Sequence, residues 1–307
     1  MDVIRIESLS KYYRHPLTGR RVTALEGLSL NVSEGETFGF LGPNGAGKTT
    51  TIKMLLGIVF PSAGNAWLFD KPHTDISVKK DIGFLPENPY FYDYLKGEEI
   101  LYFIGQLYGM NSVDLKKRVD YLLDKVGLSQ ARHLPLHKYS KGMLQRIGLA
   151  QAVIHKPKLV ILDEPLTGLD PIGRKDIRDF IFTLKDEGST IFFSTHILSD
   201  AELICDRVAI LSKGKLAKIG KLTELLSPKV KAYDIVINNL SVDGITTLKD
   251  LSSRVVIEGA QVASIVDDET KVGRVLELIN RDKAQLVSLV PQKESLEEIF
   301  IQEVKGK

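Results

Sequence analysis

The chain has 307 residues and a mass of 34.2 kDa, which is enough for two domains with cores of their own. Hydrophobic residues make up 43% and charged residues 26%, a composition that argues against both a disordered chain and a membrane-embedded body. The 41 basic residues nearly balance the 39 acidic ones, so no nucleic acid is expected as a partner.

The cysteine count, the N-terminal segment and the length of the apolar runs indicate the cellular compartment. Cys205 is the single cysteine, and the start Met1 to Ser10 lacks the basic and then apolar pattern of a secretory signal. No apolar run approaches the roughly 18 residues that cross a bilayer. We therefore expect a cytoplasmic protein that does not span a membrane, with Cys205 as a buried structural thiol in a helix over 199–206.

The first elements predict a sheet followed by a phosphate-loop unit. Alternating apolar residues over 3–9 and 28–32 predict half-buried antiparallel strands at an edge. The continuous apolar run 37–41 predicts a buried strand, and helical spacing over 48–58 follows a glycine-rich loop.

The middle of the chain predicts a helical insert and a parallel sheet. Apolar residues at helical spacing over 91–110 and 114–126 indicate the helices of the insert. Short apolar or β-branched runs over 159–162 and 190–194, joined by a helix over 175–185, are typical of buried parallel strands. The fold class expected for this part is α/β.

After Lys215 the pattern changes to a separate small α+β domain. Strands are predicted over 233–237, 254–257, 262–266 and 285–290, with helices over 272–279 and 295–304. Leu226-Ser227-Pro228 is the stretch most typical of a linker.

One loop carries a strong phosphate-binding signal. Residues Gly42 to Thr49 fit the pattern glycine, four residues, glycine, lysine and then serine or threonine, between a predicted strand and a predicted helix. Glycines let backbone N–H groups face phosphates, Lys48 adds a charge, and Thr49 is expected to hold magnesium. The loop therefore predicts an ATP site.

An acidic pair completes the predicted site. Asp163 and Glu164 follow the apolar run 159–162 directly. In phosphoryl-transfer sites such carboxylates handle the metal ion and the attacking water. We expect Asp163 to face the metal ion and Glu164 the water.

With these motifs the sequence resembles the ATP-binding subunits of ABC transporters, over about residues 1–220. Tyr13 matches the aromatic residue that stacks on adenine in that family, and Tyr12 next to it is an alternative. Ser140 and Gly142 match the signature motif that contacts the ATP bound by the opposite subunit, although Lys141 and Met143 depart from its usual sequence.

Three further positions take roles from the same resemblance. Asp170 lies in the loop by which paired cassettes sense each other, and His196 is the histidine expected at the γ-phosphate. Glu87 stands where the family commonly has glutamine, with an expected contact to magnesium or water. The ATP-binding residues implied are Tyr13, Gly42, Pro43, Asn44, Gly45, Ala46, Gly47, Lys48, Thr49, Thr50 and Glu87; the catalytic ones are Lys48, Glu164 and His196; the metal ligands are Thr49, Asp163 and Glu87.

The resemblance implies a fold and an assembly. The fold is a P-loop NTPase cassette of ABC type over 1–220, with an antiparallel edge sheet and a helical subdomain at about 88–155, followed by a small accessory domain over 221–307. The cassette is expected to work with ATP and Mg²⁺ as a homodimer, or as a heterodimer with a similar ATPase. The expected partner is an integral membrane permease, and the chain itself is expected to be cytoplasmic and peripheral on the inner face of the cell membrane.

The aromatic stretch 89–94 lies where the family docks its membrane partner, and a core role in the helical insert weighs equally. The resemblance favours an exporter. A non-transport ABC ATPase acting on ribosomes or DNA is the alternative, and a nucleotide-gated scaffold with little turnover is a third reading.

Overall fold

A computed structural model describes residues 1–14, 19–226, 230–293 and 295–305. Contacts between Cα atoms divide the chain into two units. One comprises Met1–Leu222 with the end of the chain from Glu303, and the other comprises Thr223–Gln302. Ser227 and Pro228 of the expected linker lie outside the described residues, and the assignment of the units as a cassette and an accessory domain stays a prediction.

The antiparallel edge sheet is confirmed. It has the order β2-β1-β4-β5, in which neighbouring strands run antiparallel. Its strands are β1 (Asp2–Arg14), β2 (Arg21–Ser33), β4 (Ala63–Leu68) and β5 (Lys71–Pro72). Apolar side chains on one face, Leu9 and Leu28 among them, are fully buried in the core of the first unit.

The central sheet has the order β10-β9-β3-β8-β7-β6. Its strands are β3 (Thr37–Leu41), β6 (Ile82–Leu85), β7 (Leu159–Asp163), β8 (Thr190–Thr195), β9 (Arg207–Ser212) and β10 (Lys215–Lys221). All neighbours pair in parallel except β10, which is antiparallel to β9. Because parallel strands share their direction, the carboxyl ends of β3, β7 and β8 meet at one edge, where ligands bind in such sheets.

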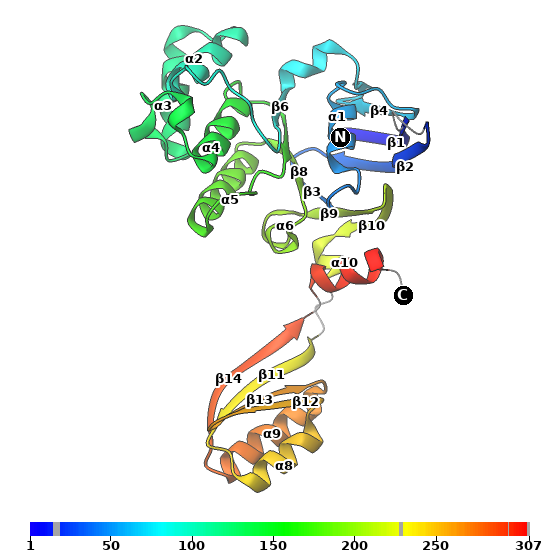
Figure 1. The fold of residues 1–307 in the computed structure, drawn as a ribbon, viewed down its shortest axis with the longest axis vertical. Coiled ribbons are helices and arrows are strands. Elements are labelled where there is room, and N and C mark those ends of the chain that lie inside the picture. Colours follow the sequence, from blue (N-terminus) through cyan, green and yellow to red (C-terminus); the bar gives the residue numbers. More distant parts are fainter. Residues whose placement is uncertain (15–18, 227–229, 294, 306–307) are drawn as a thin grey trace. The chain divides into compact units, whose positions relative to one another are not determined.

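Helices surround the central sheet and form a separate group on one side. The bounds are α1 (Lys48–Leu55), α2 (Gly97–Leu107), α3 (Ser112–Lys125), α4 (Lys141–Ala152), α5 (Pro171–Asp186), α6 (Leu198–Ile204) and α7 (Leu222–Leu225), with 3₁₀ turns at Ile76–Asp81, Ser129–Ala131 and Leu136–Lys138. Figure 1 shows α2, α3 and α4 gathered beside the sheet. A helical insert is therefore present, as the sequence predicts.

Several helix boundaries predicted from apolar spacing are wrong, and two of them have a clear local cause. The helix α1 ends at Leu55 and not at 58, because Gly57 takes a left-handed φ of 68° and its N–H bonds to Met54 O at 2.9 Å. The helix α2 begins at Gly97 and not at 91, because the Glu99 carboxylate accepts the Lys96 N–H at 2.9 Å and caps the first turn there.

The second unit has the order β-α-β-β-α-β, which is the split βαβ arrangement. Its elements are β11 (Val230–Asn238), α8 (Val242–Leu251), β12 (Arg254–Glu258), β13 (Gln261–Val266), α9 (Glu269–Arg281) and β14 (Gln285–Lys293), and α10 (Leu296–Lys305) follows. The sheet order is β12-β13-β11-β14, and α8 and α9 cover one face (Figure 1). The sequence interpretation missed α8, whose first turn Ser241 caps by accepting the Gly244 N–H at 2.9 Å.

In the part of the chain that the structure describes, none of the helices is long and apolar enough to cross a membrane. Cys205 is buried beside Gly39 at the end of α6, and burial raises the pKa of its thiol far above the ordinary value. The expectation of a buried thiol is confirmed, but the helix predicted over 199–206 ends at Ile204, because Cys205 takes an extended backbone conformation with φ of −91° and ψ of 147°.

Candidate ATP-binding and hydrolysis site

The phosphate loop connects β3 to α1, and its glycines are required by the backbone. Gly45 and Gly47 have φ of 79° and 109°, in the region that side chains disfavour. A Cβ atom on Gly47 would lie 2.5 Å from Ala24 O, and one on Gly42 would lie 2.7 Å from Leu211 O. The loop therefore keeps this backbone conformation only with glycine at these positions.

A cavity of about 250 Å³ opens over this loop. The residues that line it come from the loop, from the start of α1, and from three more distant segments: Ala24, Asn44, Gly45, Ala46, Gly47, Lys48, Thr49, Thr50, Glu87 and Glu164. Most of the expected ATP-binding residues thus share one cavity with the two acidic residues Glu87 and Glu164. The cavity combines backbone N–H groups, a helix N-terminus and one lysine, which together favour a polyphosphate.

Lys48 is buried and bonded within the site. Its Nζ donates to Gly42 O at 2.7 Å and to Pro43 O at 3.4 Å, and lies 3.2 Å from Glu164 Oε1. Gly42 and Pro43 therefore contribute carbonyl groups to Lys48 and do not line the cavity. The ammonium group lies between the loop and the acidic strand end, where it can serve both a phosphate and Glu164.

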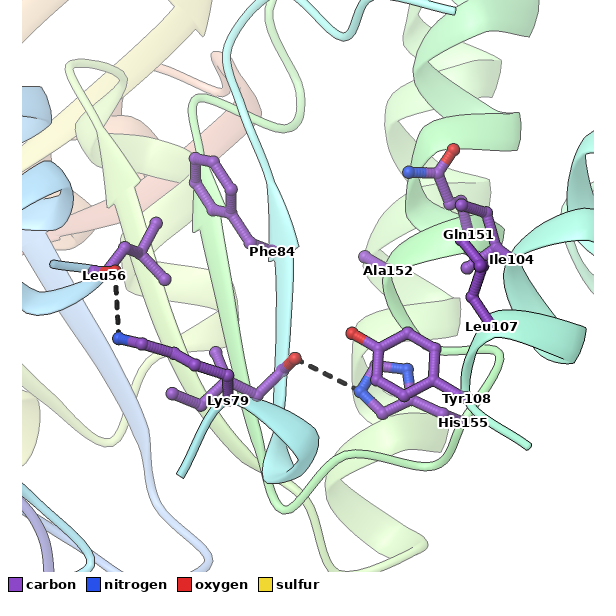
Figure 2. A pocket seen from close by; sticks show the side chains of 10 residues that line it. Leu56, Lys79, Phe84, Ile104, Leu107, Tyr108, Gln151, Ala152 and His155 are labelled. Carbon is purple, nitrogen blue, oxygen red and sulfur yellow. Dashed lines mark hydrogen bonds between the residues drawn. The ribbon is translucent and has the colours of Figure 1, made fainter. Parts of the chain in front are cut away.

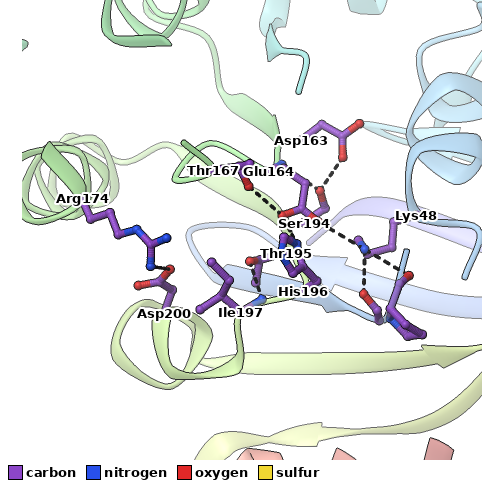
Figure 3. Close-up of polar contacts among 12 residues, drawn as sticks. Lys48, Asp163, Glu164, Thr167, Arg174, Ser194, Thr195, His196, Ile197 and Asp200 are labelled. Atoms are coloured by element: carbon purple, nitrogen blue, oxygen red, sulfur yellow. Dashed lines mark hydrogen bonds and ion pairs between the residues drawn. The ribbon is translucent and has the colours of Figure 1, made fainter. Parts of the chain in front are cut away.

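Glu164 is fixed at the end of β7 by backbone and side-chain contacts (Figure 3). Its φ is 51°, a left-handed conformation that costs of the order of 1 kcal/mol or more for a residue with a side chain. Its N–H donates to both the carbonyl and the hydroxyl oxygen of Ser194, each at 3.1 Å. These bonds hold the strained backbone and direct the carboxylate toward Lys48.

The Glu164 carboxylate has three neighbours with different roles. Oε2 lies 2.8 Å from His196 Nδ1, and a carboxylate oxygen at this distance accepts a hydrogen bond from a protonated Nδ1. Oε2 also accepts a hydrogen bond from the Thr167 hydroxyl at 3.3 Å. Oε1 is buried and has no hydrogen bond within the described chain, although the Lys48 ammonium is close enough for an ion pair. Glu164 lines the cavity, and a carboxylate there can accept a proton from a water molecule.

Asp163 lies deeper, one residue before Glu164. Its Oδ1 accepts the Ser194 hydroxyl at 2.5 Å, and the two residues are partners in the parallel β7–β8 register. Ser194 therefore contacts both acidic residues, through its hydroxyl to Asp163 and through both oxygens to the Glu164 N–H.

The signature residues lie at a different cavity of about 380 Å³. Ser140 caps α4 by accepting the Met143 N–H at 3.3 Å, and Asp170 caps α5 by accepting the Gly173 N–H at 2.6 Å. Ser140, Gly142 and Asp170 all line this cavity, together with Lys141, whose side chain lies over Gly168. Within one chain these residues and the phosphate-loop residues line separate cavities.

Tyr13 is not among the residues that line the phosphate-loop cavity. It lies on β1, partly exposed, with the Lys11 ammonium 5.1 Å from its ring centre. The alternative, Tyr12, is covered by the Arg21 guanidinium at 3.2 Å from the ring centre. Tyr13 is thus the more open of the two rings.

A further cavity of about 470 Å³ is lined by residues of α2, α4, β6 and neighbouring segments (Figure 2). Apolar side chains such as Phe84, Ile104 and Leu107 line it. On one side Tyr108 stacks flat on His155, with ring centres 3.7 Å apart, and His155 Nε2 bonds to Ile82 O at 3.1 Å. Burial lowers the pKa of His155 below its ordinary value.

Sequence reasoning gave no role to three residues of the site. Ser194 and Thr167 bond directly to the acidic pair, and Ala24 places its carbonyl against Gly47. Ser194 had a usable signal, because it precedes Thr195 and His196 at a strand end. Ala24 had none, since it reaches the site only through the fold of the edge sheet.

Comparison with known proteins agrees with this geometry. The family described as "ABC transporter" matches residues 25–167. An uncharacterized ABC transporter ATP-binding protein of Nostoc is 42% identical over 99% of this chain and 90% of its own length. The chain belongs to the ATP-binding proteins of ABC transporters. As a member of this family it binds ATP and is an ATPase.

A named relative and a solved structure extend the comparison. The linearmycin resistance ATP-binding protein of Bacillus subtilis is 31% identical over 97% of both chains. A solved ATP-binding subunit of an ABC transporter is 31% identical, with a TM-score of 0.65 over 73% of this chain and 91% of that one. The cassette fold predicted for this ABC ATPase is confirmed.

Proposed function

We propose that this ABC ATPase hydrolyses ATP to drive a separate integral membrane permease, working in the cytoplasm at the inner face of the cell membrane. The observation that carries the proposal is the Glu164 carboxylate, which lies at the phosphate-loop cavity between Lys48 and His196. A site that only binds nucleotide needs no such carboxylate beside the phosphates, and a site that hydrolyses it does.

Hydrolysis follows from the contacts of Glu164. Its free Oε1 takes a proton from water, whose oxygen forms a bond to the γ-phosphorus as the bond to the bridging oxygen of ADP breaks. Before this step Lys48 leaves Glu164 to contact the β- and γ-phosphates, and His196 holds the other carboxylate oxygen. The products are ADP and inorganic phosphate.

The same edge of the sheet fits Mg²⁺. Mg²⁺ would be held by the Thr49 hydroxyl and the Glu87 carboxylate, which line the cavity, and by the buried Asp163 carboxylate, all of them oxygen ligands that this ion prefers in combination with phosphate oxygens. Once bound, the ion neutralises charge on the phosphates. Asp163 is held for this role by the Ser194 hydroxyl.

The separation of the two cavities supports a paired arrangement. Ser140 and Gly142 offer a hydroxyl and a helix N-terminus to an anion, yet the phosphate loop of their own chain lines another cavity. We infer that they contact the ATP of a second subunit, identical or similar, while Asp170 senses that subunit and Tyr13 stacks on adenine. Each ATP then lies between two chains.

The permease is proposed to dock beside α2. Of the aromatic stretch, Phe91 is buried while Tyr90, Tyr92 and Tyr94 are exposed, Tyr90 by 95%. Tyr92 contacts Phe103 of α2 edge to face, and the neighbouring Ile104 lines the apolar cavity of Figure 2. Exposed aromatic rings next to an apolar cavity fit a protein partner better than solvent.

Export is the proposed direction, and the printed name of the linearmycin resistance relative supports it. Resistance is achieved when a compound leaves the cell.

We further propose residues 1–220 as the cassette, with the helical subdomain at about 88–155, and residues 221–307 as an accessory domain.

The test combines a trapped variant with partner identification. Glu164→Gln keeps the size of the side chain but removes the base, so we expect an ATP-bound dimer and a loss of turnover of at least about 100-fold. Glu187→Gln, at an exposed glutamate outside the site, is the matched control and should turn over ATP normally. A Glu164→Gln chain that stays monomeric at saturating ATP contradicts the paired mechanism.

Partners are identified by mass spectrometry after purification in mild detergent. Recovery of a polytopic permease supports transport. Ribosomal proteins or DNA in its place would overturn the transport function and leave the ATPase activity standing.

A further inference from the structure

The strand β12 forms one edge of the sheet in the second unit. It pairs on its inner side with β13, from Arg254 opposite Ile265 to Glu258 opposite Gln261, without any register shift. A regular edge strand presents a row of backbone N–H and C=O groups that another strand can pair with. The outer side of β12 can therefore pair with a further strand.

The opposite edge, β14, carries features that discourage pairing. Pro291 lies within it and has no N–H, and its register with β11 shifts between Val236 and Ile237. By contrast, β12 reads Arg-Val-Val-Ile-Glu and contains neither proline, glycine nor lysine. Only one of the two edges is therefore suited to strand addition.

The apolar side chains of β12 are exposed on both faces. Val255 packs against the core under α8 and α9, while Val256 points to the other face and is 40% exposed. Ile257 is on the same side as Val255 yet remains 47% exposed, because it lies at the edge. A further strand beside β12 would cover both Val256 and Ile257.

The charges at the two ends of β12 are opposite and symmetrically placed. In an antiparallel pair centred on Val256, Arg254 of one copy lies directly opposite Glu258 of the other, and the same pair recurs at the other end. Val255 then lies opposite Ile257, and both are β-branched residues that pair well across strands. Within the described residues neither Arg254 nor Glu258 takes part in an ion pair.

We propose that β12 is a homodimerisation edge, at which the same strand of a second copy of this chain adds antiparallel and in register at Val256. The two four-stranded sheets then form one continuous sheet with an isologous contact. This contact needs no nucleotide, unlike the closure of the cassettes, and it raises the effective concentration of one cassette near the other.

The register is tested by crosslinking the full-length chain without nucleotide. Val256→Cys places two thiols opposite each other at the centre of the proposed pair, within reach of a disulfide. The native Cys205 is buried and does not compete. Val290→Cys, at a 52% exposed position on the protected edge β14, is the matched control. We expect Val256→Cys to form disulfide-linked dimers at least about tenfold faster under mild oxidation.

Charge exchange supplies the second test, on exposed side chains that do not hold the fold. In the Val256→Cys chain, Arg254→Glu places like charges opposite each other twice and should slow crosslinking by at least about fivefold. Adding Glu258→Arg should restore the original rate. The proposal is overturned if Val256→Cys crosslinks no faster than Val290→Cys, or if the double exchange fails to restore the rate. Neither outcome bears on ATP hydrolysis.

Discussion

The Ser194 hydroxyl is predicted to be a main support of the acidic pair, and Ser194→Ala removes it. Two bonds are lost: the 2.5 Å donation to the Asp163 carboxylate and the acceptance of the Glu164 N–H at 3.1 Å. A bond to a charged group contributes about 1.5–3 kcal/mol and a neutral one about 0.5–1.5 kcal/mol, so the expected loss is about 2–4.5 kcal/mol. At about 2–4 °C per kcal/mol for a unit of this size, the melting temperature should fall by about 4–18 °C.

Ser189→Ala is the matched control for this variant. Ser189 is also a buried serine next to the start of β8, but its hydroxyl makes one neutral bond, to Pro157 O at 2.9 Å. The expected loss is about 0.5–1.5 kcal/mol. Ser194→Ala should in addition lower kcat by about tenfold or more, because the Glu164 backbone loses an anchor. Differential scanning fluorimetry and a phosphate-release assay measure both effects. Equal melting temperatures and equal kcat for the two variants would refute the reasoning.

Three further predictions concern other buried groups. Gly47→Ala should abolish ATP binding in a fluorescent-nucleotide titration, because the new Cβ would clash with Ala24 O. Gly188→Ala is the control, since Gly188 also has a positive φ but has open space around it. This variant should lose only about 1–2 kcal/mol of unfolding free energy and keep ATP binding. Because the pKa of His155 is lowered in the folded chain, this imidazole binds a proton at higher pH in the unfolded chain than in the folded one. The free energy of unfolding from urea titrations should therefore fall as the pH drops from about 7 through the folded-state pKa. His155→Gln should flatten this dependence on pH. Cys205 should react with a thiol reagent at pH 8 only after unfolding, and rapid reaction of the folded chain would contradict its raised pKa.

The sequence predicts those features of the fold and site that depend on neighbouring residues. The glycine pattern from Gly42 to Thr49 determines its own turn, and the apolar run before Asp163 determines where the acidic pair emerges. Helix ends were less predictable: apolar spacing continues through Leu56 and Ile58, while Gly57 ends the helix by its backbone conformation.

Contacts between distant segments could not be predicted. The bonds of Ser194 to Asp163 depend on the parallel register of β7 and β8, which no local pattern encodes. Likewise Ala24 reaches Gly47 only because the edge sheet packs over the loop. The assignments of Tyr13, Ser140 and Asp170 rest on motif position, and in a single chain these residues lie away from the phosphate-loop cavity.

The contacts of Lys48 make ATP binding an exchange of partners. In the structure the ammonium group is bonded to the Gly42 carbonyl and paired with Glu164. Incoming phosphates must compete with these contacts for Lys48. The measured ATP affinity is therefore the difference between the free energy of the new phosphate contacts and that of the contacts they replace. The exchange also orders the steps, because the Glu164 carboxylate loses the Lys48 ammonium group when the phosphate binds it. In the proposed mechanism, Glu164 is thereby released as the base only when substrate is in position.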